Sequence, residues 1–137
     1  MIIQLASDAP LVVRTAAGAG LVLHITGAAT GLVAGTVSLF ALNRAQKRAE
    51  VGYALAANVW GRGYATEALK LAVDFAFETV GVARLEADID PRNEASCRLV
   101  ERIGFVREGL LRERWHVAGE ATDSAMYGLL ARDLASR

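Results

Sequence analysis

The sequence contains little cysteine or histidine, and these scarcities exclude whole classes of protein. Cys97 is the only cysteine among 137 residues, so no internal disulfide can form, and a reducing cytoplasm is the expected compartment. The two histidines and this cysteine form no cluster with the spacing of zinc ligands. We therefore expect a cytoplasmic protein without a metal site.

Excess charge of one sign and long apolar runs are also missing. Fifteen Lys and Arg residues balance fifteen Asp and Glu residues, which argues against a nucleic-acid or membrane-surface partner. The apolar run at 21–25 is far shorter than the roughly 20 residues of a membrane span. Residues 1–10 lack the basic and then apolar pattern of a signal peptide. Hydrophobic residues make up 53% of the chain, so residues 1–137 predict a single folded domain.

Alternating hydrophobicity bounded by turn residues predicts the strands of the fold. In the third of them, Val51, Tyr53 and Leu55 share one face, while Glu50 and Gly52 share the other. The predicted strands span residues 21–26, 32–40, 49–56, 84–90, 105–117 and 122–130.

Two amphipathic helices are predicted between these strands. The first follows residue 63 and ends at Gly81, and the second spans 94–103 and ends at Gly104. The apolar stripe of the first helix consists of Leu69, Val73, Ala76, Phe77 and Val80. The order β-β-β-α-β-α-β-β predicts an α/β (α+β) fold with a mostly antiparallel mixed sheet and flanking helices. Its strand-helix-strand unit favours parallel pairing of 49–56 with 84–90.

A glycine-containing loop at 58–66 joins the third strand directly to the first helix. Amide groups at the start of a helix have no intrahelical partner, and the helix dipole adds positive charge there. Gly61 and Gly63 let the backbone approach an anion closely, although a tight strand-to-helix turn alone would also need glycine. A dinucleotide fingerprint would need a third glycine at position 66, and a Walker loop would need Gly-Lys-Ser/Thr. The loop therefore indicates a phosphate cradle of another kind.

This loop and two further motifs resemble those of the GNAT N-acetyltransferases. The run Asn58-Val-Trp-Gly61-Arg-Gly63 is similar to the family signature Gln/Arg-x-x-Gly-x-Gly/Ala, with asparagine at its first position. The helix at 94–103 follows an Asn-x-x-Ser motif and leads to Gly-Phe at 104–105, and residues 119–127 resemble a closing hairpin. Together the motifs, over roughly 32–130, are similar to the ribosomal-protein N-terminal acetyltransferase (Rim-type) branch.

The resemblance implies that acetyl-CoA binds across the end of the strand at 49–56. Its pantetheine arm would pair with the backbone at the end of that strand, and its pyrophosphate would lie on the amides of 62–66. Arg62 could add a charge-assisted contact to a phosphate, or it is a solvated loop arginine. The residues expected to bind acetyl-CoA are Leu55, Ala56, Ala57, Gly61, Arg62, Gly63, Tyr64, Ala65, Thr66, Asn93 and Ser96.

Glu50 is the candidate general base, because it begins the cofactor-binding strand and shares a face with small residues. If that face lines the site, few side chains compete with it for the amine. The alternative is an exposed strand-end glutamate paired with Arg48.

Ser96 is the candidate proton donor to the departing thiolate. It shares a helix face with Leu99, Val100 and Ile103, where a polar group needs a partner. The alternative is a serine bonded to a carbonyl of its own turn. Many GNAT enzymes carry a tyrosine acid at the position of Val100, so the departure leaves Ser96 or water. Asn93 would bind the cofactor or cap the helix.

Three other reactive or aromatic residues are weaker candidates. Cys97 is expected on the polar side of its helix, and Tyr53 and Trp60 are expected in the core or in the wall of the cofactor site.

The predicted activity is transfer of an acetyl group to a primary amine, on a protein N-terminus or a small molecule. The alternatives are an acyl-CoA-binding sensor with little turnover and an unrelated phosphate-binding module. Family members usually begin with a strand and one or two helices, but the residues before Leu21 have room for one strand, at 11–15, and hardly for two helices. The acceptor site is therefore expected to be open or completed by a second subunit, and a homodimer is predicted.

Overall fold

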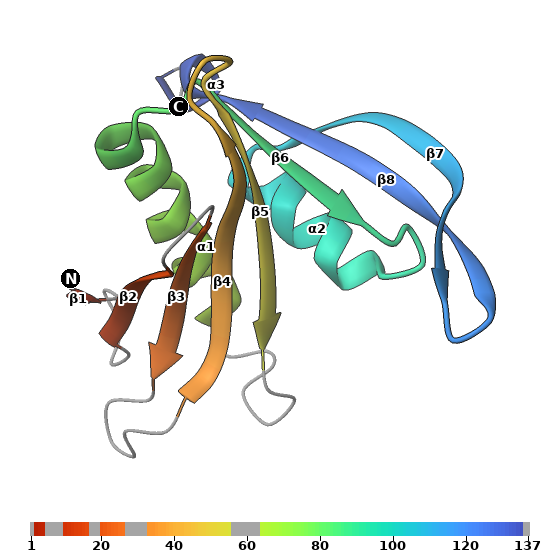
Figure 1. The fold of residues 1–137 in the computed structure, drawn as a ribbon, viewed down its shortest axis with the longest axis horizontal. Helices are drawn as coiled ribbons and strands as arrows, with labels where there is room; N and C mark the ends of the chain where they lie inside the picture. Colours follow the sequence, from red (N-terminus) through yellow and green to blue (C-terminus); the bar gives the residue numbers. More distant parts are fainter. Residues whose placement is uncertain (1, 5–9, 17–19, 27–32, 56–63, 136–137) are drawn as a thin grey trace.

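The computed structural model describes the backbone of residues 2–4, 10–16, 20–26, 33–55 and 64–135, and the side chains of residues 35–53 and 65–134. Within these ranges, strands dominate and two helices of more than one turn pack on them (Figure 1). The strands are β1 (Ile2–Gln4), β2 (Pro10–Ala16), β3 (Gly20–Thr26), β4 (Val33–Asn43), β5 (Arg48–Leu55), β6 (Arg84–Ile89), β7 (Val106–Val117) and β8 (Glu120–Leu130). The helical segments are α1 (Tyr64–Phe75), the π-helical turn η2 (Ala76–Val80), α2 (Glu94–Ile103) and the short α3 (Ala131–Ala135).

All of these strands belong to one sheet, in the order β1-β2-β3-β4-β5-β6-β8-β7. Neighbouring strands are antiparallel except β5 and β6, which are parallel, as the strand-helix-strand pattern predicted. The parallel register consists of Arg48 with Arg84, Ala49 with Leu85 and Glu50 with Glu86. Beyond these pairs β5 and β6 diverge, and Figure 1 shows the two halves of the sheet meeting near the top and separating downward.

The predicted strands and helices are all present, with ends within three residues of the expected ones. The confirmed order begins at β3. Before it, β2 forms the single strand for which room was expected, and β1 adds a further strand that the pattern did not predict. At the other end, α3 also lies outside the prediction.

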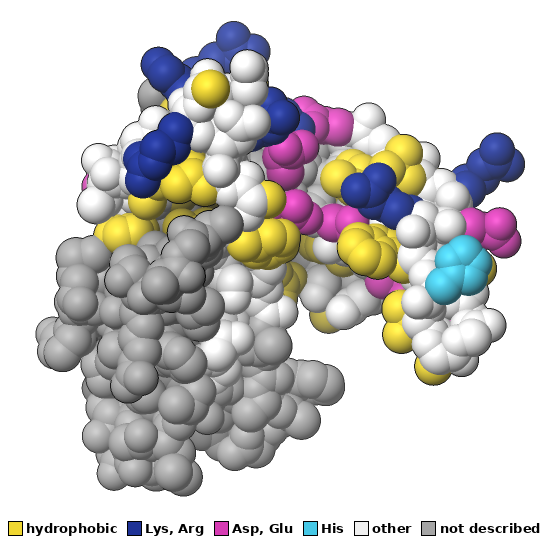
Figure 2. Space-filling model, in the orientation of Figure 1, with side chains coloured by type: hydrophobic (Ala, Val, Ile, Leu, Met, Phe, Trp, Pro, Cys, Tyr) yellow, Lys and Arg dark blue, Asp and Glu magenta, His cyan; other side chains and the backbone are white. Residues whose placement is uncertain are grey.

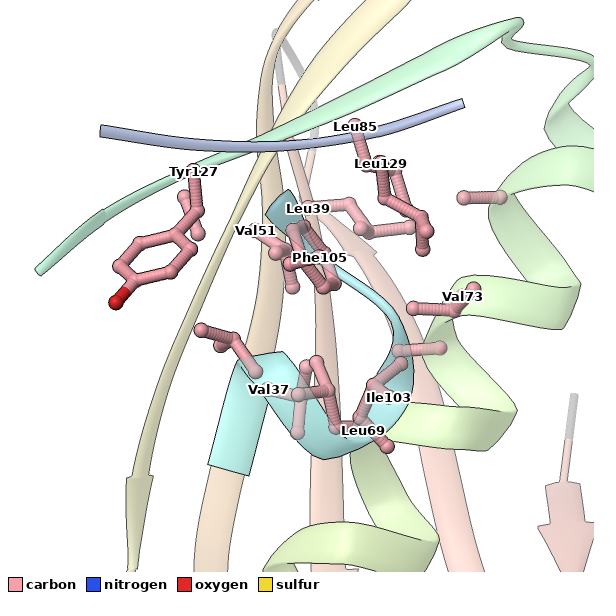
Figure 3. Close-up of a cluster of buried hydrophobic side chains, with 14 of the residues drawn as sticks. Val37, Leu39, Val51, Leu69, Val73, Leu85, Ile103, Phe105, Tyr127 and Leu129 are labelled. Carbon is pink, nitrogen blue, oxygen red and sulfur yellow. The ribbon is translucent and has the colours of Figure 1, made fainter. Parts of the chain in front are cut away.

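One hydrophobic core lies between the sheet and the pair α1 and α2 (Figure 3). Strict alternation buries Leu85, Ala87 and Ile89 of β6, which are at most 8% exposed. The predicted stripe of the first helix is fully buried at Leu69, Val73 and Ala76 and partly buried at Phe77 and Val80. The opposite face of the sheet is left uncovered by α1 and α2. We call it the open face.

The helices end where the sequence predicted, for identifiable reasons. Gly81 follows η2 with φ +86°, a left-handed conformation that favours glycine, and its N–H bonds back to the Ala76 carbonyl. Asn93 caps α2, because its side-chain oxygen accepts a hydrogen bond from the Ser96 N–H at 3.1 Å. None of the helices in the described part of the chain is long and apolar enough to cross a membrane.

β7 is an edge strand, and all its residues are exposed. Its register with β8 shifts twice, between Arg107 and Gly109 and between Leu111 and Trp115. Within the second irregularity Glu113 has φ +50°, and its N–H bonds to Asp123 Oδ1 at 2.8 Å. The large apolar side chains that β7 exposes, by 40 to 60%, are Val106, Leu110, Leu111, Trp115 and Val117.

Candidate functional site

β5 and β6 part after Glu50 and Glu86, their last register pair. Each strand continues and keeps its other neighbour: β5 pairs with β4 through Leu55, and β6 pairs with β8 through Ile89. The two facing edges, at 51–55 and 87–89, therefore have no strand partner across the divergence. Peptide groups on such edges are available for hydrogen bonds with a ligand.

Glu50 is half-buried at the start of this divergence. Its register partners are Phe40 on β4 and Glu86 on β6. Burial raises the pKa of the Glu50 carboxyl, and the negative charges of Asp88 and Glu86 raise it further, while Arg114 lowers it. We call Glu50, Glu86 and Asp88 the acidic trio. A carboxyl with a raised pKa is better matched to general-base work near neutral pH than an ordinary one.

Arginines neutralise two members of the acidic trio. The carboxylate of Glu86 has Arg48 Nε at 3.7 Å and Arg84 Nη2 at 3.4 Å, and the carboxylate of Asp88 has Arg114 Nε at 3.6 Å. The third member forms no ion pair with a described residue, and it is the one at the divergence. The arrangement leaves Glu50 as the member of the acidic trio whose charge a bound cation or a proton could balance.

The alternative reading of Glu50, a pair with Arg48, is therefore not what the structure shows. Asp88 is also held by the Trp115 indole, whose Nε1–H donates to Asp88 Oδ2 at 3.0 Å. Figure 2 shows acidic side chains gathered near the middle of the open face, with basic side chains around them.

The expectation that small residues leave space beside Glu50 needs one correction. Gly52 has no side chain, but the Phe40 ring lies against it, 3.2 Å from where a Cβ would stand. An apolar ring, 39% exposed, therefore flanks the carboxylate. This ring contributes to the burial that raises the pKa of Glu50.

α2 reaches the divergence from the helix side of the sheet. Ser96 lies in its first turn, on the face whose Leu99, Val100 and Ile103 are buried, as predicted. The Tyr53 hydroxyl donates a hydrogen bond to the Ser96 carbonyl oxygen at 3.5 Å. Burial raises the pKa of the Tyr53 phenol. The site thus has a carboxylate on the open face and two hydroxyl groups on the helix side.

The alternative roles of α2 residues can be compared with the contacts. The Ser96 side chain is a hydrogen-bond neighbour of the Tyr53 phenol, and among the described residues no bond from its hydroxyl to a carbonyl of its own turn is seen. Asn93 caps the helix through its oxygen, as one of its two readings required. A contact from Asn93 to a cofactor stays a prediction.

Cys97 does not lie on a polar side of α2, and this expectation was wrong. Its side chain is partly buried and packs against the core. It lies beside the buried Tyr127, whose hydroxyl donates to Glu101 Oε1 at 2.8 Å. Burial raises the pKa of the Tyr127 phenol, and its contacts with Cys97 and Glu101 raise it further. The helix therefore presents a wider face to the sheet than its apolar stripe indicated.

Most of the predicted cofactor loop lies outside the described residues. This applies to Ala56, Ala57, Gly61, Arg62 and Gly63, and to Trp60. Leu55 ends β5 beside the divergence, and Tyr64, Ala65 and Thr66 form the first turn of α1. The described parts thus put the two ends of the loop at a strand end and at a helix N-terminus, as expected.

Comparison with known proteins connects this geometry to a family. Residues 6–106 match the model of the acetyltransferase (GNAT) domain. The chain belongs to the GNAT acetyltransferase family. It is 37% identical over 106 residues to the N-acetyltransferase p20 of Bacillus licheniformis, a match that covers 77% of this chain and 60% of the relative. It is 32% identical over 90 residues to the spermidine N(1)-acetyltransferase of Escherichia coli K12, covering 66% of this chain and 48% of that one.

A solved GNAT structure gives the same relationship in three dimensions. Mycobacterium smegmatis RimJ in complex with CoA-disulfide superposes with a TM-score of 0.80 at 30% identity, covering 85% of this chain and 56% of that chain. This agrees with the resemblance to the Rim-type branch. The GNAT chain described here spans about half to three fifths of the length of these relatives.

Sequence reasoning missed several residues that the fold brings to the site. Glu86, Asp88 and Trp115 were not among the candidate residues. The alternation of Glu86 and Asp88 with buried residues is visible in the sequence, but their position beside Glu50 depends on the parallel register. Tyr53 was expected in the core or in the wall of the cofactor site, without its contact to α2.

Proposed function

We propose that this GNAT chain transfers an acetyl group from acetyl-CoA to a primary amine, on a protein N-terminus or a small molecule. The observation that carries the proposal is the position of Glu50: a half-buried carboxylate with a raised pKa, at the point where two parallel strands part. Acetyl-CoA is proposed as the acetyl donor because the chain belongs to the GNAT acetyltransferase family. One relative is named a spermidine N(1)-acetyltransferase, which supports a small amine as the acceptor. Another is RimJ, of the Rim-type branch, which supports a protein N-terminus.

The described residues fit acetyl-CoA as the co-substrate. The unpaired edge of β5 at 51–55 offers peptide groups to the amide-rich pantetheine arm. The first turn of α1 offers N–H groups and partial positive charge to phosphates. When bound there, acetyl-CoA supplies the acyl group as a thioester. The residues proposed to hold it are those predicted from the motifs: Leu55, Ala56, Ala57, Gly61, Arg62, Gly63, Tyr64, Ala65, Thr66, Asn93 and Ser96.

Glu50 is proposed to accept the proton that the amine loses, directly or through a water. An acceptor enters as an ammonium ion, which this carboxylate attracts, and must become neutral before its nitrogen can attack. The raised pKa of Glu50 makes it a stronger base than an exposed glutamate. The neighbouring carboxylates Glu86 and Asp88 add attraction for the cation, although arginines neutralise most of their charge.

The Ser96 hydroxyl is proposed to act as a donor to the sulfur of the departing CoA. It lies across the divergence from Glu50, on the helix side, where its neighbour is the Tyr53 hydroxyl. In this proposal Glu50 removes a proton from the amine on the open face, and Ser96 donates to the sulfur on the helix side.

The test is thiol release from acetyl-CoA with a panel of primary amines, for the wild type and Glu50→Gln. We expect the substitution to lower kcat/KM by roughly ten- to ten-thousandfold while CoA affinity, measured by calorimetry, stays within a few fold. Asp74→Asn, an exposed acid on α1, is the matched control. CoA binding without turnover on any amine would instead indicate an acyl-CoA sensor. Absence of CoA binding would overturn the proposal.

We further propose that the protein acts as a homodimer in the cytoplasm. The support is the exposed apolar surface of β7, from Val106 to Val117, which is more than an edge strand usually leaves to water. Sedimentation at micromolar concentration should give a dimer, and Leu110→Lys should shift it toward monomer while Arg112→Lys does not. A wild-type monomer would reject the dimer. The free, partly buried Cys97 suits a reducing compartment, which cell fractionation can check.

A further inference from the structure

We propose that Tyr53 is a catalytic residue of this GNAT chain, and that its phenol hydroxyl gives a proton to the thiolate leaving acetyl-CoA. The inference rests on the proposed function, and it adds a second hydroxyl to the one that sequence motifs identified.

Tyr53 stands on the part of β5 that has no strand partner on the side of the divergence. It is three residues beyond Glu50, the last residue paired with β6, and β5 there pairs only with β4. Alternation places it on the face of the buried Val51, which is the helix side, whereas Glu50 is on the open face. A ligand on the unpaired edge would have the carboxylate on one side and the phenol on the other.

The Tyr53 hydroxyl is held loosely at this position. It donates a hydrogen bond to the Ser96 carbonyl oxygen, which at 3.5 Å is near the limit for such a bond. The contact aims the hydroxyl at the first turn of α2, beside the candidate serine. A long bond to a carbonyl is readily exchanged for a stronger bond to an anionic sulfur.

The surroundings keep this phenol protonated before the reaction. Burial raises its pKa, and the nearby Cys97 thiol acts in the same direction, whereas a hydrogen bond from the Ser96 side chain lowers it. No carboxylate is among the groups that act on Tyr53, because the acidic trio is on the other face. The group is therefore a proton donor, and Glu50 is the acceptor.

Acid strength favours the phenol over the serine. An unperturbed phenol has a pKa of about 10, roughly 1.5 pH units above that of a thiol, and burial raises the pKa of Tyr53 further, so its proton transfer to a thiolate is uphill. An aliphatic hydroxyl is a much weaker acid. Ser96 would then contribute a hydrogen bond to the sulfur, and Tyr53 the proton.

The step balances without any added reagent. Glu50 first passes the ammonium proton to water. The neutral amine nitrogen then forms its bond to the acetyl carbon as the carbon–sulfur bond breaks, and its second surplus proton goes to the free Glu50 carboxylate. The sulfur takes the electron pair of the broken bond and the Tyr53 proton, which gives free CoA thiol. The tyrosinate regains a proton from water.

Tyr53→Phe removes the hydroxyl and keeps the ring, and Tyr127→Phe is the matched control, because it removes a second buried phenol beside Cys97. Besides kcat and KM, the test measures the ultraviolet absorbance of the thiolate of enzyme-bound CoA against pH. It also compares the affinities for CoA and for desulfo-CoA, which lacks the sulfur.

We expect Tyr53→Phe to lower kcat by roughly ten- to a hundredfold with little change in KM, the low end of the range for a general acid. The pKa of the bound CoA thiol should rise by about one pH unit, because the thiolate loses a hydrogen bond, while desulfo-CoA affinity stays unchanged. Ser96→Ala should raise that pKa less, and Tyr127→Phe should leave it unchanged. A Tyr53→Phe protein with wild-type kcat and an unshifted thiol pKa would overturn this inference alone. A wild type that binds no CoA would overturn the proposed function and this inference together.

Discussion

Replacing Asp88 by asparagine should lower the pKa of Glu50 and extend the activity of the enzyme to more acidic pH. Asp88 is the largest charged contributor among those that raise the pKa of Glu50. The substitution removes its negative charge but keeps an oxygen that can accept the Trp115 hydrogen bond. It also releases Arg114 from its ion pair, and Arg114 lowers the pKa of Glu50. Both effects have the same sign.

The size of the effect follows from the positions of the two residues. Glu50 pairs with Glu86, so Asp88 is a diagonal neighbour, and such side chains are about 7 Å apart. Two unit charges at that distance repel by roughly 0.6 kcal/mol in water and by roughly 2.4 kcal/mol at an effective permittivity of about 20. A half-buried carboxyl lies between these limits, so the pKa should fall by roughly 0.4 to 1.7 pH units.

The assay is the pH dependence of kcat/KM at low ionic strength. In the proposed mechanism Glu50 accepts a proton only when deprotonated, so the rate should fall as the pH drops through its raised pKa. In Asp88→Asn this acidic limb should move downward by about one pH unit, and in Asp74→Asn it should not move. Added salt should shrink the difference, because it screens charges that are partly exposed. An acidic limb that is the same in Asp88→Asn, Asp74→Asn and the wild type would refute the assignment of that limb to Glu50.

Three further predictions concern the cofactor loop and the fold. Gly63→Val should weaken CoA binding at least about tenfold, roughly 1.4 kcal/mol, in a protein with an unchanged circular dichroism spectrum, because a branched side chain would block the approach to the pyrophosphate. Gly81→Ala should lower the free energy of unfolding by about 1 kcal/mol, because Gly81 has φ +86°; Gly109→Ala, in open space with an ordinary φ, should change it by less than about 0.5 kcal/mol. Leu85→Ala should cost about 2–5 kcal/mol in urea unfolding, since Leu85 is 0% exposed, whereas Lys70→Ala, on the exposed face of α1, should cost little. Equal losses of unfolding free energy in the two glycine variants would contradict the backbone argument. Equal losses in the buried and the exposed variant would contradict the burial argument.

The strands and helices could be predicted because their patterns are local. Leu85, Ala87 and Ile89 alternate with polar residues because β6 is buried on one face. Gly81 and Gly104 end their helices by adopting positive φ, which does not depend on the rest of the fold. The parallel step was predictable as well, since a helix between two strands nearly always returns the chain in that direction.

The divergence of β5 and β6 could not be predicted, because no local signal marks where strand pairing stops. The residues of β5 beyond Glu50 are as strand-like as those before it, and the same holds for β6 beyond Glu86. The surroundings of Glu50, which set its pKa, come from three strands at once. Cys97 was misplaced for a related reason: it lies beside Tyr127 of β8, and the strand order that brings β8 next to β6 leaves no mark in the sequence of α2.

The two irregularities in β7 have a consequence for how copies of the chain can meet. A long, regular edge strand with exposed apolar side chains could recruit strand after strand into an open-ended fibre. In β7 the register shifts at Arg107–Gly109 and at Leu111–Trp115 break the edge into short stretches with different twist. No single stretch offers a long template for another strand. We therefore expect contact through this edge to give a closed dimer. The irregular backbone of β7 should prevent further chains from adding to the sheet.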